Sequence, residues 1–427
     1  MPLTKEGYRK RILDERISED LHAFGAVCIE GPKWCGKTWT ALHHAASACF
    51  IADPQGDYQN RAMARISPSL VLQGASPRLL DEWQEVPSLW DAVRHEVDQS
   101  AARGRFILTG SSTPNRKGVL HSGTGRIATI RMRPMSLFES DDSSGEVSLR
   151  SLFSGPVAPV RTGDADLDRL IRLTVRGGWP GSLDKDSAAA ARSCRSYLKS
   201  TVENEAARVD DVRRDPRKLW MLIRSLARNE GTVVANRTLR QDMLEEGEEA
   251  PDVDTIAEYL QVLNRMFLLE DQPAFSPNLR SSIRVGKSPK RRFVDPSLAV
   301  AAMAATPERL LNDLKTFGFL FESLCVRDLR IHAESIDANL FHYRDSAGRE
   351  IDAVIELPDG RWGAFEVKLG ANQIDQAAKD LLEIMELMHT DPKAKAPEFL
   401  CVICGMTNAA YTRPDGVRVI PITALGP

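Results

Sequence analysis

Residues 31–38 read GPKWCGKT, in which two glycines, a lysine and a threonine have the spacing of a phosphate-binding loop. The apolar run 26–30 precedes this segment, and a helical pattern follows it through Leu42. In that order, the backbone N–H groups of the loop and the N-terminus of the helix can surround a phosphate. Lys37 would neutralise the β and γ phosphates and Thr38 would hold Mg²⁺. The segment therefore predicts binding of ATP with Mg²⁺.

The loop departs from the commoner form of this motif at Trp34 and Cys35, where smaller or more polar residues would serve. Binding should survive, because the loop backbone supplies the donors to phosphate. An exposed Cys35 thiol would make the site sensitive to thiol reagents. The alternative is an ordinary strand, turn and helix with an incidental lysine. The expected nucleotide contacts in the loop are Gly31, Pro32, Lys33, Trp34, Cys35, Gly36, Lys37 and Thr38.

The segment RLLDEWQEV at 78–86 begins as an apolar strand that ends in two acids, Asp81 and Glu82, at the place expected for a Walker B strand. Asp81 would reach Mg²⁺, directly or through water, and Glu82 would polarise the attacking water as general base. Acids at such a position can instead cap the helix that follows.

A third strand-like run, RFILTGSS at 105–112, ends in small polar residues. Thr109 or Ser111 could orient the attacking water between the phosphate loop and the acidic strand. The order of phosphate loop, acidic strand and polar-ended strand is the layout of an AAA-type core, in which helices cover a parallel sheet. We therefore expect an α/β fold for this part.

The run from LTGSS to the segment GTGRIATIRMRPMSLFE at 123–139 resembles a bacterial and archaeal family of AAA-type ATPases with a C-terminal domain of unknown function. The resemblance covers nearly the whole chain and includes RGGWPGSL at 176–183 and SPKRRFVDPSL at 288–298. It implies that Arg126 is a candidate arginine finger, acting across a subunit interface of a homo-oligomer. The alternative is that Arg126 is a surface charge.

Near the other end of the chain, residues 349–370 read REIDAVIELPDGRWGAFEVKLG, two alternating strand-like runs around a turn. A three-residue loop at 358–360 would place Asp352 opposite Glu366, with Glu350 and Lys368 on the same face. A two-residue loop would shift the register by one and separate these side chains.

Two carboxylates across a hairpin, with a lysine two residues beyond the second, resemble the PD-(D/E)XK nuclease core. The resemblance implies that Asp352 and Glu366 hold Mg²⁺ and that Lys368 positions or activates water. An earlier helix would add Glu322, and Gln376 on a following helix could reach the site. The helix at 373–389 and the strand FLCVICG complete the expected α-β-β-α-β order. The alternative is an ion-pair ladder without catalysis.

Cys401 and Cys404 form a C-x-x-C pair within this last apolar run. Positions three apart on a strand point to opposite faces, so a shared metal or disulfide is disfavoured against core packing.

Between the two ends, helical patterns at 217–231, 236–246 and from 254, followed by FLLEDQPAF, make a winged-helix-like module plausible. The acidic stretch 245–254 opposes DNA at the usual reading position. Basic residues cluster in the segment 280–292, namely Arg280, Arg284, Lys287, Lys290, Arg291 and Arg292. They could contact DNA, or they could be solvated or pair within the molecule.

The composition of the chain limits the functions that these motifs can support. The 427 residues have 42% apolar and 27% charged composition and a formal net charge of −3, so any DNA contact must come from a local patch. The seven cysteines form no even framework, and the chain offers neither a signal-like N-terminus nor an apolar run of membrane-spanning length. We expect a cytoplasmic protein.

We expect five segments: an AAA-type core with an N-terminal helix (1–140), a linker or insertion (141–168), a helical connector (169–215), a winged-helix-like module (216–285) and a nuclease-like α/β domain (286–427). The favoured function is an ATPase whose nucleotide state controls the C-terminal domain, which acts on DNA or a partner. One alternative is an ATP-regulated, Mg²⁺-dependent DNA nuclease. The other is a nucleotide-dependent protein-interaction switch with slow hydrolysis.

Overall fold

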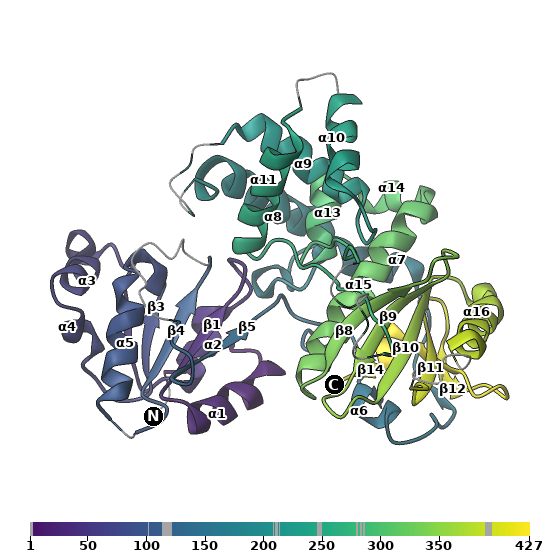
Figure 1. The fold of residues 1–427 in the computed structure, drawn as a ribbon, viewed down its shortest axis with the longest axis horizontal. Helices are drawn as coiled ribbons and strands as arrows, with labels where there is room; N and C mark the ends of the chain where they lie inside the picture. The colour runs from purple at the N-terminus through teal and green to yellow at the C-terminus, as the bar shows by residue number, and fades with distance from the viewer. Residues whose placement is uncertain are drawn as a thin grey trace.

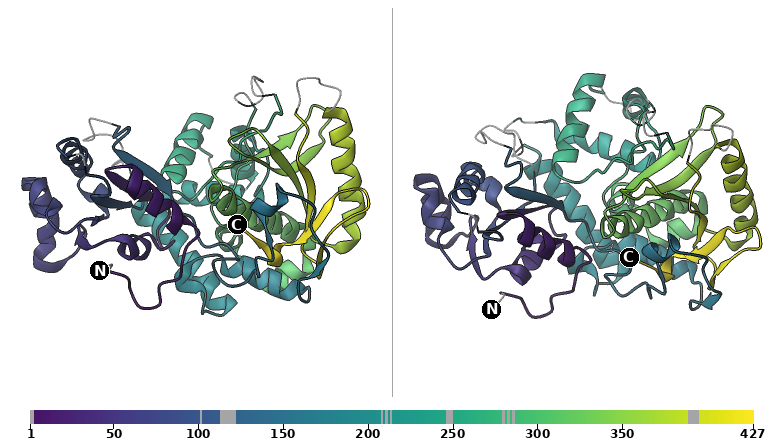
Figure 2. Two further views of the ribbon diagram at one scale, coloured as in Figure 1. Left: turned by 90° about the horizontal axis from the view of Figure 1, so that it is seen from below. Right: turned by 60° about the horizontal axis from the view of Figure 1, so that its bottom comes forward.

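The structure, a computed structural model of the 427-residue chain, describes all residues except 1, 2, 101, 113–121, 208, 210, 211, 213, 246–249, 279, 280, 282, 283, 285, 286 and 389–394. Figure 1 shows a parallel sheet with its helices, a group of helices, and a mixed sheet flanked by helices. The two sheets remain at opposite ends of the molecule in both views of Figure 2. No membrane-spanning helix occurs in the described part, because none of its helices combines the necessary length and apolar character.

Five parallel strands form the N-terminal sheet in the order β2-β3-β4-β1-β5. They are β1 (Ala26–Glu30), β2 (Ser47–Phe50), β3 (Arg78–Asp81), β4 (Phe106–Gly110) and β5 (Ile127–Arg131). The strand β4 lies between β1, which enters the phosphate loop, and β3, which ends in the first of the two acids. Because parallel strands have their carboxyl ends at one edge of the sheet, the loop and the acids meet there.

Helices cover both faces of this sheet, as the alternation of side chains along its strands requires. Val27 and Ile29 of β1 pack on the side of α1 (Leu13–Ala23) and α2 (Lys37–His44). Ala26 and Cys28 pack on the other side, with α3 (Gln55–Ile66), α4 (Pro68–Leu72) and α5 (Ser88–Asp98). The expected α/β core of parallel strands covered by helices is therefore present.

The predicted linker or insertion at 141–168 contributes strands to the C-terminal part. Its strand β6 (Val147–Ser148) pairs in parallel with β14 (Leu425–Gly426). After α6 (Leu149–Leu152), β7 (Val160–Arg161) pairs with β12 (Ala409–Thr412) at one edge of the mixed sheet. Ser, Gly, Asp and Pro also favour tight turns, and such short elements need turns between them.

Helices dominate the middle of the chain: α7 (Leu167–Arg176), α8 (Ser187–Ser200), α9 (Pro216–Arg228), α10 (Asn236–Glu245), α11 (Val253–Arg265), α13 (Pro296–Ala302) and α14 (Pro307–Asn312). The apolar face predicted for α9 is buried. Helix α13 packs against α7, α8 and α9, and α14 packs against α7. Residues 296–312 therefore belong to this helical group, although the sequence placed them in the C-terminal domain.

The segment 269–293 connects the helical group to the mixed sheet. Three antiparallel backbone bridges hold it, and they join Thr232 to Arg291, Leu269 to Phe293 and Gln272 to Lys290. A parallel bridge then joins Ala274 to His342 of β8 (Asn339–Arg344), which is the edge strand of the mixed sheet. The bridge of Ala274 thus joins this segment to the mixed sheet of the C-terminal part.

Seven strands form the mixed sheet in the order β7-β12-β13-β11-β10-β9-β8. The strands not yet bounded are β9 (Glu350–Glu356), β10 (Trp362–Lys368), β11 (Phe399–Cys404) and β13 (Arg418–Pro421). Helix α15 (Leu314–Glu334) packs on one face and α16 (Ile374–Met388) on the other. The expected order of helix, two strands, helix and strand is present, with β8 added after the first helix.

The predicted hairpin register is confirmed for the paired residues nearest the turn. Trp362 lies opposite Glu356, and Phe365 lies opposite Ala353, as the three-residue loop requires. The alternation is less regular than predicted at the start of β9, because Ile351 packs on the α16 side while Ala353 packs on the α15 side. Cys401 and Cys404 lie in different core clusters, which confirms that they face opposite ways.

Candidate nucleotide site and C-terminal acid cluster

The phosphate loop is closed by its own lysine. Lys37 Nζ donates hydrogen bonds to the carbonyl oxygens of Gly31 (2.9 Å) and Pro32 (2.8 Å). Gly36 has φ 105°, and a Cβ at Gly31 would lie 2.1 Å from Met132 O, so the backbone path requires both glycines. A phosphate in the loop would offer Lys37 charged oxygens in place of these carbonyls.

Asp81 connects the acidic strand to the loop through two hydroxyl groups. Thr38 Oγ1 donates to Asp81 Oδ1 at 2.8 Å, and Thr109 Oγ1 donates to the same oxygen at 2.7 Å. Burial raises the pKa of Asp81, although the bonds from Thr109 and Thr38 oppose this shift. A hydroxyl and a carboxylate in contact at the mouth of the loop are oxygen donors of the kind that Mg²⁺ prefers.

Glu82 is held beside Asp81 in an uncommon backbone conformation. Its φ is 58°, which costs about 1–3 kcal/mol for a residue other than glycine. Its backbone N–H donates to Thr109 Oγ1 (3.1 Å), and its carboxylate accepts bonds from Ser111 Oγ (2.9 Å) and from Gln84 Nε2. Thr109 and Ser111, predicted to orient water, therefore contact the two acids.

The unusual loop residues have distinct environments. The Trp34 side chain is 55% exposed, and its ring centroid lies 5.3 Å from that of Tyr197. Lys33 Nζ forms an ion pair with Glu205 at 2.7 Å. Cys35 is fully buried, and its thiol contacts Met132 O at 3.7 Å. The exposed thiol that the sequence left open is therefore absent at Cys35.

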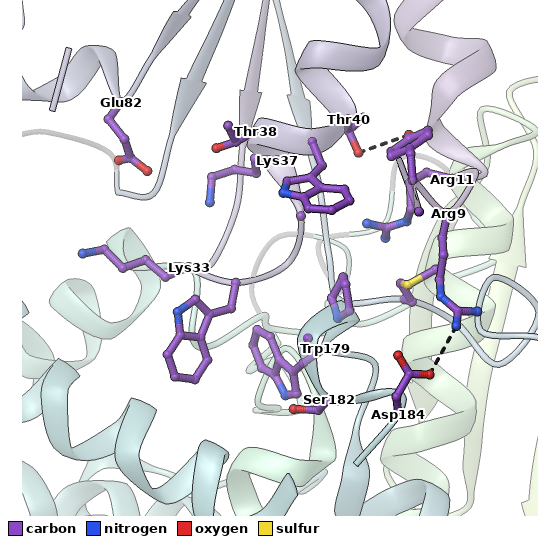
Figure 3. Close-up of a pocket in the computed structure, with 18 of the residues that line it drawn as sticks. Arg9, Arg11, Lys33, Lys37, Thr38, Thr40, Glu82, Trp179, Ser182 and Asp184 are labelled. Carbon is purple, nitrogen blue, oxygen red and sulfur yellow. Dashed lines mark hydrogen bonds and ion pairs between the residues drawn. The ribbon is translucent and has the colours of Figure 1, made fainter. Parts of the chain in front are cut away.

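A cleft of about 1060 Å³ opens beside the loop, slightly larger than the ~300–1,000 Å³ typical of small-molecule sites. The N-terminal segment lines it with Tyr8, Arg9 and Arg11. Figure 3 shows Lys37, Thr38 and Glu82 on one side of the cleft, and Trp179, Ser182 and Asp184 on the other. The sequence did not predict that the N-terminal segment and the segment around Trp179 would line this cleft. The glycine-rich run RGGWPGSL was noticed in the sequence, but no role was assigned to it.

Arg126 lies away from the phosphate loop of its own chain. Its carbonyl accepts a bond from Ala26 N (3.1 Å) at the start of β1, whereas the loop follows the other end of that strand. Five residues of strand, or about 16 Å, separate the two ends. The half-exposed side chain of Arg126 pairs with Asp98 at 2.8 Å. Arg126 is therefore not placed to contact a nucleotide bound in the phosphate loop of its own chain.

Glu270 lies at the boundary between the N-terminal sheet and the C-terminal part, where it contacts three arginines. Arg133 donates from Nε to Oε2 and from Nη2 to Oε1, both at 2.7 Å. Arg131 (3.7 Å) and Arg330 of α15 (3.3 Å) approach the same carboxylate. Burial alone would raise the pKa of Glu270, but Arg133 and the other arginines hold it well below its ordinary value.

The predicted nuclease-like residues converge against α15. Lys368 Nζ pairs with Glu366 Oε1 at 2.7 Å, and Asp352 Oδ2 accepts a bond from Val367 N at 2.9 Å. Glu322 of α15 and Asp352 both contact the ammonium group of Lys290. We call Glu322, Asp352 and Glu366 the acid cluster. Gln376 bonds to Asp380 instead and is exposed.

The carboxylates of the acid cluster affect one another's protonation. Burial raises the pKa of Glu366 to about 8, and Asp352 adds to this shift while Lys368 opposes it. Burial and then Glu322 raise the pKa of Asp352. For Glu322, burial acts upward, but Arg292 and Lys290 lower its pKa overall.

Most of the described cations of the predicted basic segment form hydrogen bonds or ion pairs within the molecule. Arg284 forms a bidentate pair with Glu356, at 2.8 Å for both bonds. Arg291 bonds to Asn236 Oδ1 at 2.8 Å, and Arg292 bonds to Glu322 and Ser323. Lys287 is exposed, although its Nζ bonds to Arg344 O, and Arg280 lies outside the described residues. The described cations therefore favour the intramolecular role, with Glu356 and Glu322 of the C-terminal part among their partners.

Within the described residues, Asp14, His43 and His44 form the one group of three potential metal ligands whose ligand atoms lie within 4.8 Å of one another. The Asp14 carboxylate already accepts bonds from Arg11 N (2.8 Å), Tyr8 Oη (2.7 Å) and His44 Nε2 (3.1 Å). These bonds give the group a structural explanation, because they fasten the N-terminal segment to α1 and α2.

Comparison with known families identifies the class of the N-terminal part. A family model described as an AAA domain matches residues 23–140. Two further models, each described as a domain of unknown function (DUF8612 and DUF4143), match residues 167–309 and 317–425. With its parallel sheet, phosphate loop and acidic strand, the N-terminal part is an AAA-type P-loop ATPase domain.

Relatives of the whole chain include the uncharacterized proteins Rv2008c of Mycobacterium tuberculosis and Mb2031c of Mycobacterium bovis. Each is 26% identical over 364 residues, which cover 83% of this chain and 72% of the relative. The Walker-type ATPase PABY2304 of Pyrococcus abyssi has a TM-score of 0.43 at 13% identity, over 70% of this chain and 97% of that one. The Aeropyrum pernix ORC1 protein in complex with DNA has a TM-score of 0.28 at 16% identity, over 70% and 93%.

Proposed function

We propose that this protein binds and hydrolyses ATP, and that its nucleotide state controls the C-terminal domain. The observation that carries the first part is the contact of Thr38 with Asp81 at the mouth of the phosphate loop, with Glu82 fixed beside it. These are the oxygen donors for Mg²⁺ and the general base that hydrolysis needs.

Each polar residue has a defined task in this proposal. Lys37 leaves the carbonyls of the loop and binds the phosphates, while Thr38 and Asp81 hold Mg²⁺. When bound, Mg²⁺ neutralises charge on the transferring phosphoryl group. Glu82 accepts the proton of the attacking water, and Ser111 keeps its carboxylate oriented.

Coupling to the C-terminal part rests on a continuous series of contacts. The loop touches Met132 through Gly31 and Cys35, and Met132 precedes Arg133 in the chain. Arg133 binds Glu270, which lies in the connecting segment 269–293. Two residues further on, Gln272 Nε2 donates to Asp352 O at 2.8 Å. A shift of the loop on nucleotide binding can therefore reach Asp352 through packed, hydrogen-bonded groups.

Two measurements on the purified protein test this proposal. ATP hydrolysis should be detected with Mg²⁺ and should be lost on chelation. Hydrogen exchange at residues 268–275 should change when ATP is added to Glu82→Gln, which holds the nucleotide without turnover. Unchanged exchange at saturating ATP would refute the coupling, whereas ATP binding with only slow hydrolysis would favour the protein-interaction switch.

The second candidate function is an ATP-regulated, Mg²⁺-dependent DNA nuclease, favoured by the convergence of Glu322, Asp352, Glu366 and Lys368 in one cluster. Linear, circular and single-stranded DNA should be incubated with Mg²⁺ or Mn²⁺, with and without ATP, beside Asp352→Ala. Cleavage by the wild type alone would support the nuclease. Cleavage that persists in Asp352→Ala would point to contamination, and absence of cleavage would favour a binding role.

We also propose that this protein contacts DNA and forms a homo-oligomer. The helices α9 to α11 and the bridges at 269–293 support a winged-helix-like module, and DNA contact through the C-terminal domain would follow from the nuclease-like arrangement. A homo-oligomer would allow Arg126 to reach a neighbouring nucleotide. The seven unpaired, buried cysteines support a reducing cytoplasm.

A further inference from the structure

The ammonium group of Lys290 lies among carboxylates of the C-terminal part. Its Nζ is 3.2 Å from Glu322 Oε1, 3.4 Å from Glu350 Oε2 and 3.6 Å from Asp352 Oδ1. Only 3% of the residue is exposed. Two of these three acids, Glu322 and Asp352, belong to the acid cluster, so the ammonium group of Lys290 already occupies the space between them.

This cation balances charges that would otherwise repel one another. Burial alone would lower the pKa of Lys290, but Glu322 and Asp352 outweigh burial and raise it, so the side chain is charged. Arg292 adds a second contact to Glu322 from the same segment. Burying several carboxylates without a cation is strongly unfavourable. Lys290 therefore adds to the charge compensation that Arg292 gives Glu322 and Lys368 gives Glu366.

The residues present fit a divalent cation only in part. Glutamate and aspartate oxygens are suitable ligands, and Glu366 Oε2 is a buried atom with no hydrogen-bond partner among the described residues. However, the carboxylate oxygens of the three acids do not all lie within 4.8 Å of one another, so the acids do not surround one ion in this conformation. A bound ion would require the acids to close in and Lys290 to withdraw.

We propose that Lys290 is a built-in competitor for a divalent cation, so that the acid cluster takes up Mg²⁺ or Mn²⁺ only when the segment carrying Lys290 moves. The inference rests on the second candidate function for the existence of the metal site, but it is independent of ATP hydrolysis. It adds to that function a reason why Lys290, rather than a metal ion, contacts the acids in this conformation.

Neighbouring contacts hold the segment in place. Gln272 pairs with Lys290 through the backbone, and its side chain bonds to both Asp352 O and Arg292 Nε. Arg284, which precedes Lys290 in the same segment, forms a bidentate ion pair with Glu356. Glu270 lies two residues before Gln272, so the path from the nucleotide loop ends at the same segment. Movement of Glu270 would change the position of Lys290 relative to the acids.

The test measures binding of Mn²⁺ alone to the full chain, by calorimetry and by electron paramagnetic resonance. Lys290→Met keeps the length of the side chain and removes its charge, and should bind Mn²⁺ at least ten times more tightly than the wild type. Adding Asp352→Asn should remove this gain. Lys287→Met is the matched control, because it removes a charge from the same segment without touching the acids, and it should bind as the wild type does.

A second variant guards against a folding defect in Lys290→Met. Arg284→Ala releases the anchor at Glu356 while keeping Lys290, and should also raise the affinity for Mn²⁺, with native folding checked by circular dichroism. Equal affinity of the wild type and both variants would refute the competitor role and leave the metal site standing. Absence of Mn²⁺ binding in all of them would refute both the metal site and the competitor.

Discussion

Arg133 and Glu270 form a bidentate ion pair between the AAA-type domain and the segment that leads to the C-terminal acid cluster. Both nitrogen–oxygen distances are 2.7 Å, and both side chains are largely buried. Arg133 also pairs with Glu334 of α15 at 2.6 Å. The two residues therefore bind the nucleotide domain to both the connecting segment and the C-terminal part.

Glu270→Gln should destabilise the protein by roughly 3 kcal/mol, because it leaves buried arginines without their shared counter-ion. Urea unfolding followed by circular dichroism measures this loss. Glu258→Gln, on the exposed face of α11, should change stability by no more than about 0.5 kcal/mol. Equal stability of the two variants would show that the ion pairs of Glu270 do not stabilise the contact between the AAA-type domain and the C-terminal part.

Lys37→Ala should abolish ATP binding, because it removes the ammonium group that lies in the loop and would pair with the β and γ phosphates. Titration with a fluorescent ATP analogue measures the affinity. The exposed Lys10→Ala is the control for removal of a nearby positive charge, and should bind as the wild type does. Full affinity in Lys37→Ala would remove the site from this loop.

Glu82→Gln should keep ATP binding and lower turnover by roughly 10²–10⁴-fold, the usual contribution of a general base. The amide can still accept the bond from Ser111, so the local structure should persist. Phosphate release under saturating ATP measures turnover, and the same titration measures binding. Undiminished hydrolysis would assign the base to another residue.

Thiol reagents should modify the native protein slowly and without an effect on ATP binding. All seven cysteines are buried, and burial raises the pKa of several of them, including Cys28 and Cys401. Reaction with a chromogenic disulfide should be at least about tenfold slower in the native state than in urea. Rapid modification of one thiol that ATP prevents would place Cys35 at the surface of the site.

Acid should destabilise the protein partly through His332. Burial lowers the pKa of this fully buried histidine to about 4, against an ordinary value of 6.5, so the folded state prefers the neutral ring. Its contribution is fully present above pH 6.5 and is lost as the pH falls towards 4, by about 3 kcal/mol. Thermal unfolding of His332→Leu should show a smaller loss over this range. An identical loss in the two proteins would exclude His332 as a contributor.

Local patterns were sufficient to predict several elements. The strand, glycine loop and helix around Lys37 lie within one short stretch, and Asp81 and Glu82 end an apolar strand, so their order alone predicted the nucleotide site. The turn at 358–360 set the register of the hairpin, which the structure confirms as far as the pairing of Ala353 with Phe365. Apolar spacing also predicted the buried face of α9.

Domain boundaries were less predictable, because short elements can join a distant sheet. The predicted linker supplies β6 and β7, whose partners β14 and β12 lie more than 200 positions further along the chain. The segments that form the walls of the cleft, around Arg9 and Trp179, carry no periodic signal that would bring them to the phosphate loop.

The sequence by itself determined the phosphate loop, the acids that end β3 and the hairpin that places Asp352 near Glu366. These features depend on neighbours in the chain, and backbone geometry fixes them locally. Only the tertiary structure decided which charges pair: Arg133 with Glu270, 137 positions apart, and Lys290 with Glu322, 32 apart. Each cation could pair with many acids of the sequence, and the fold selects the buried partners whose charge offsets the loss of water.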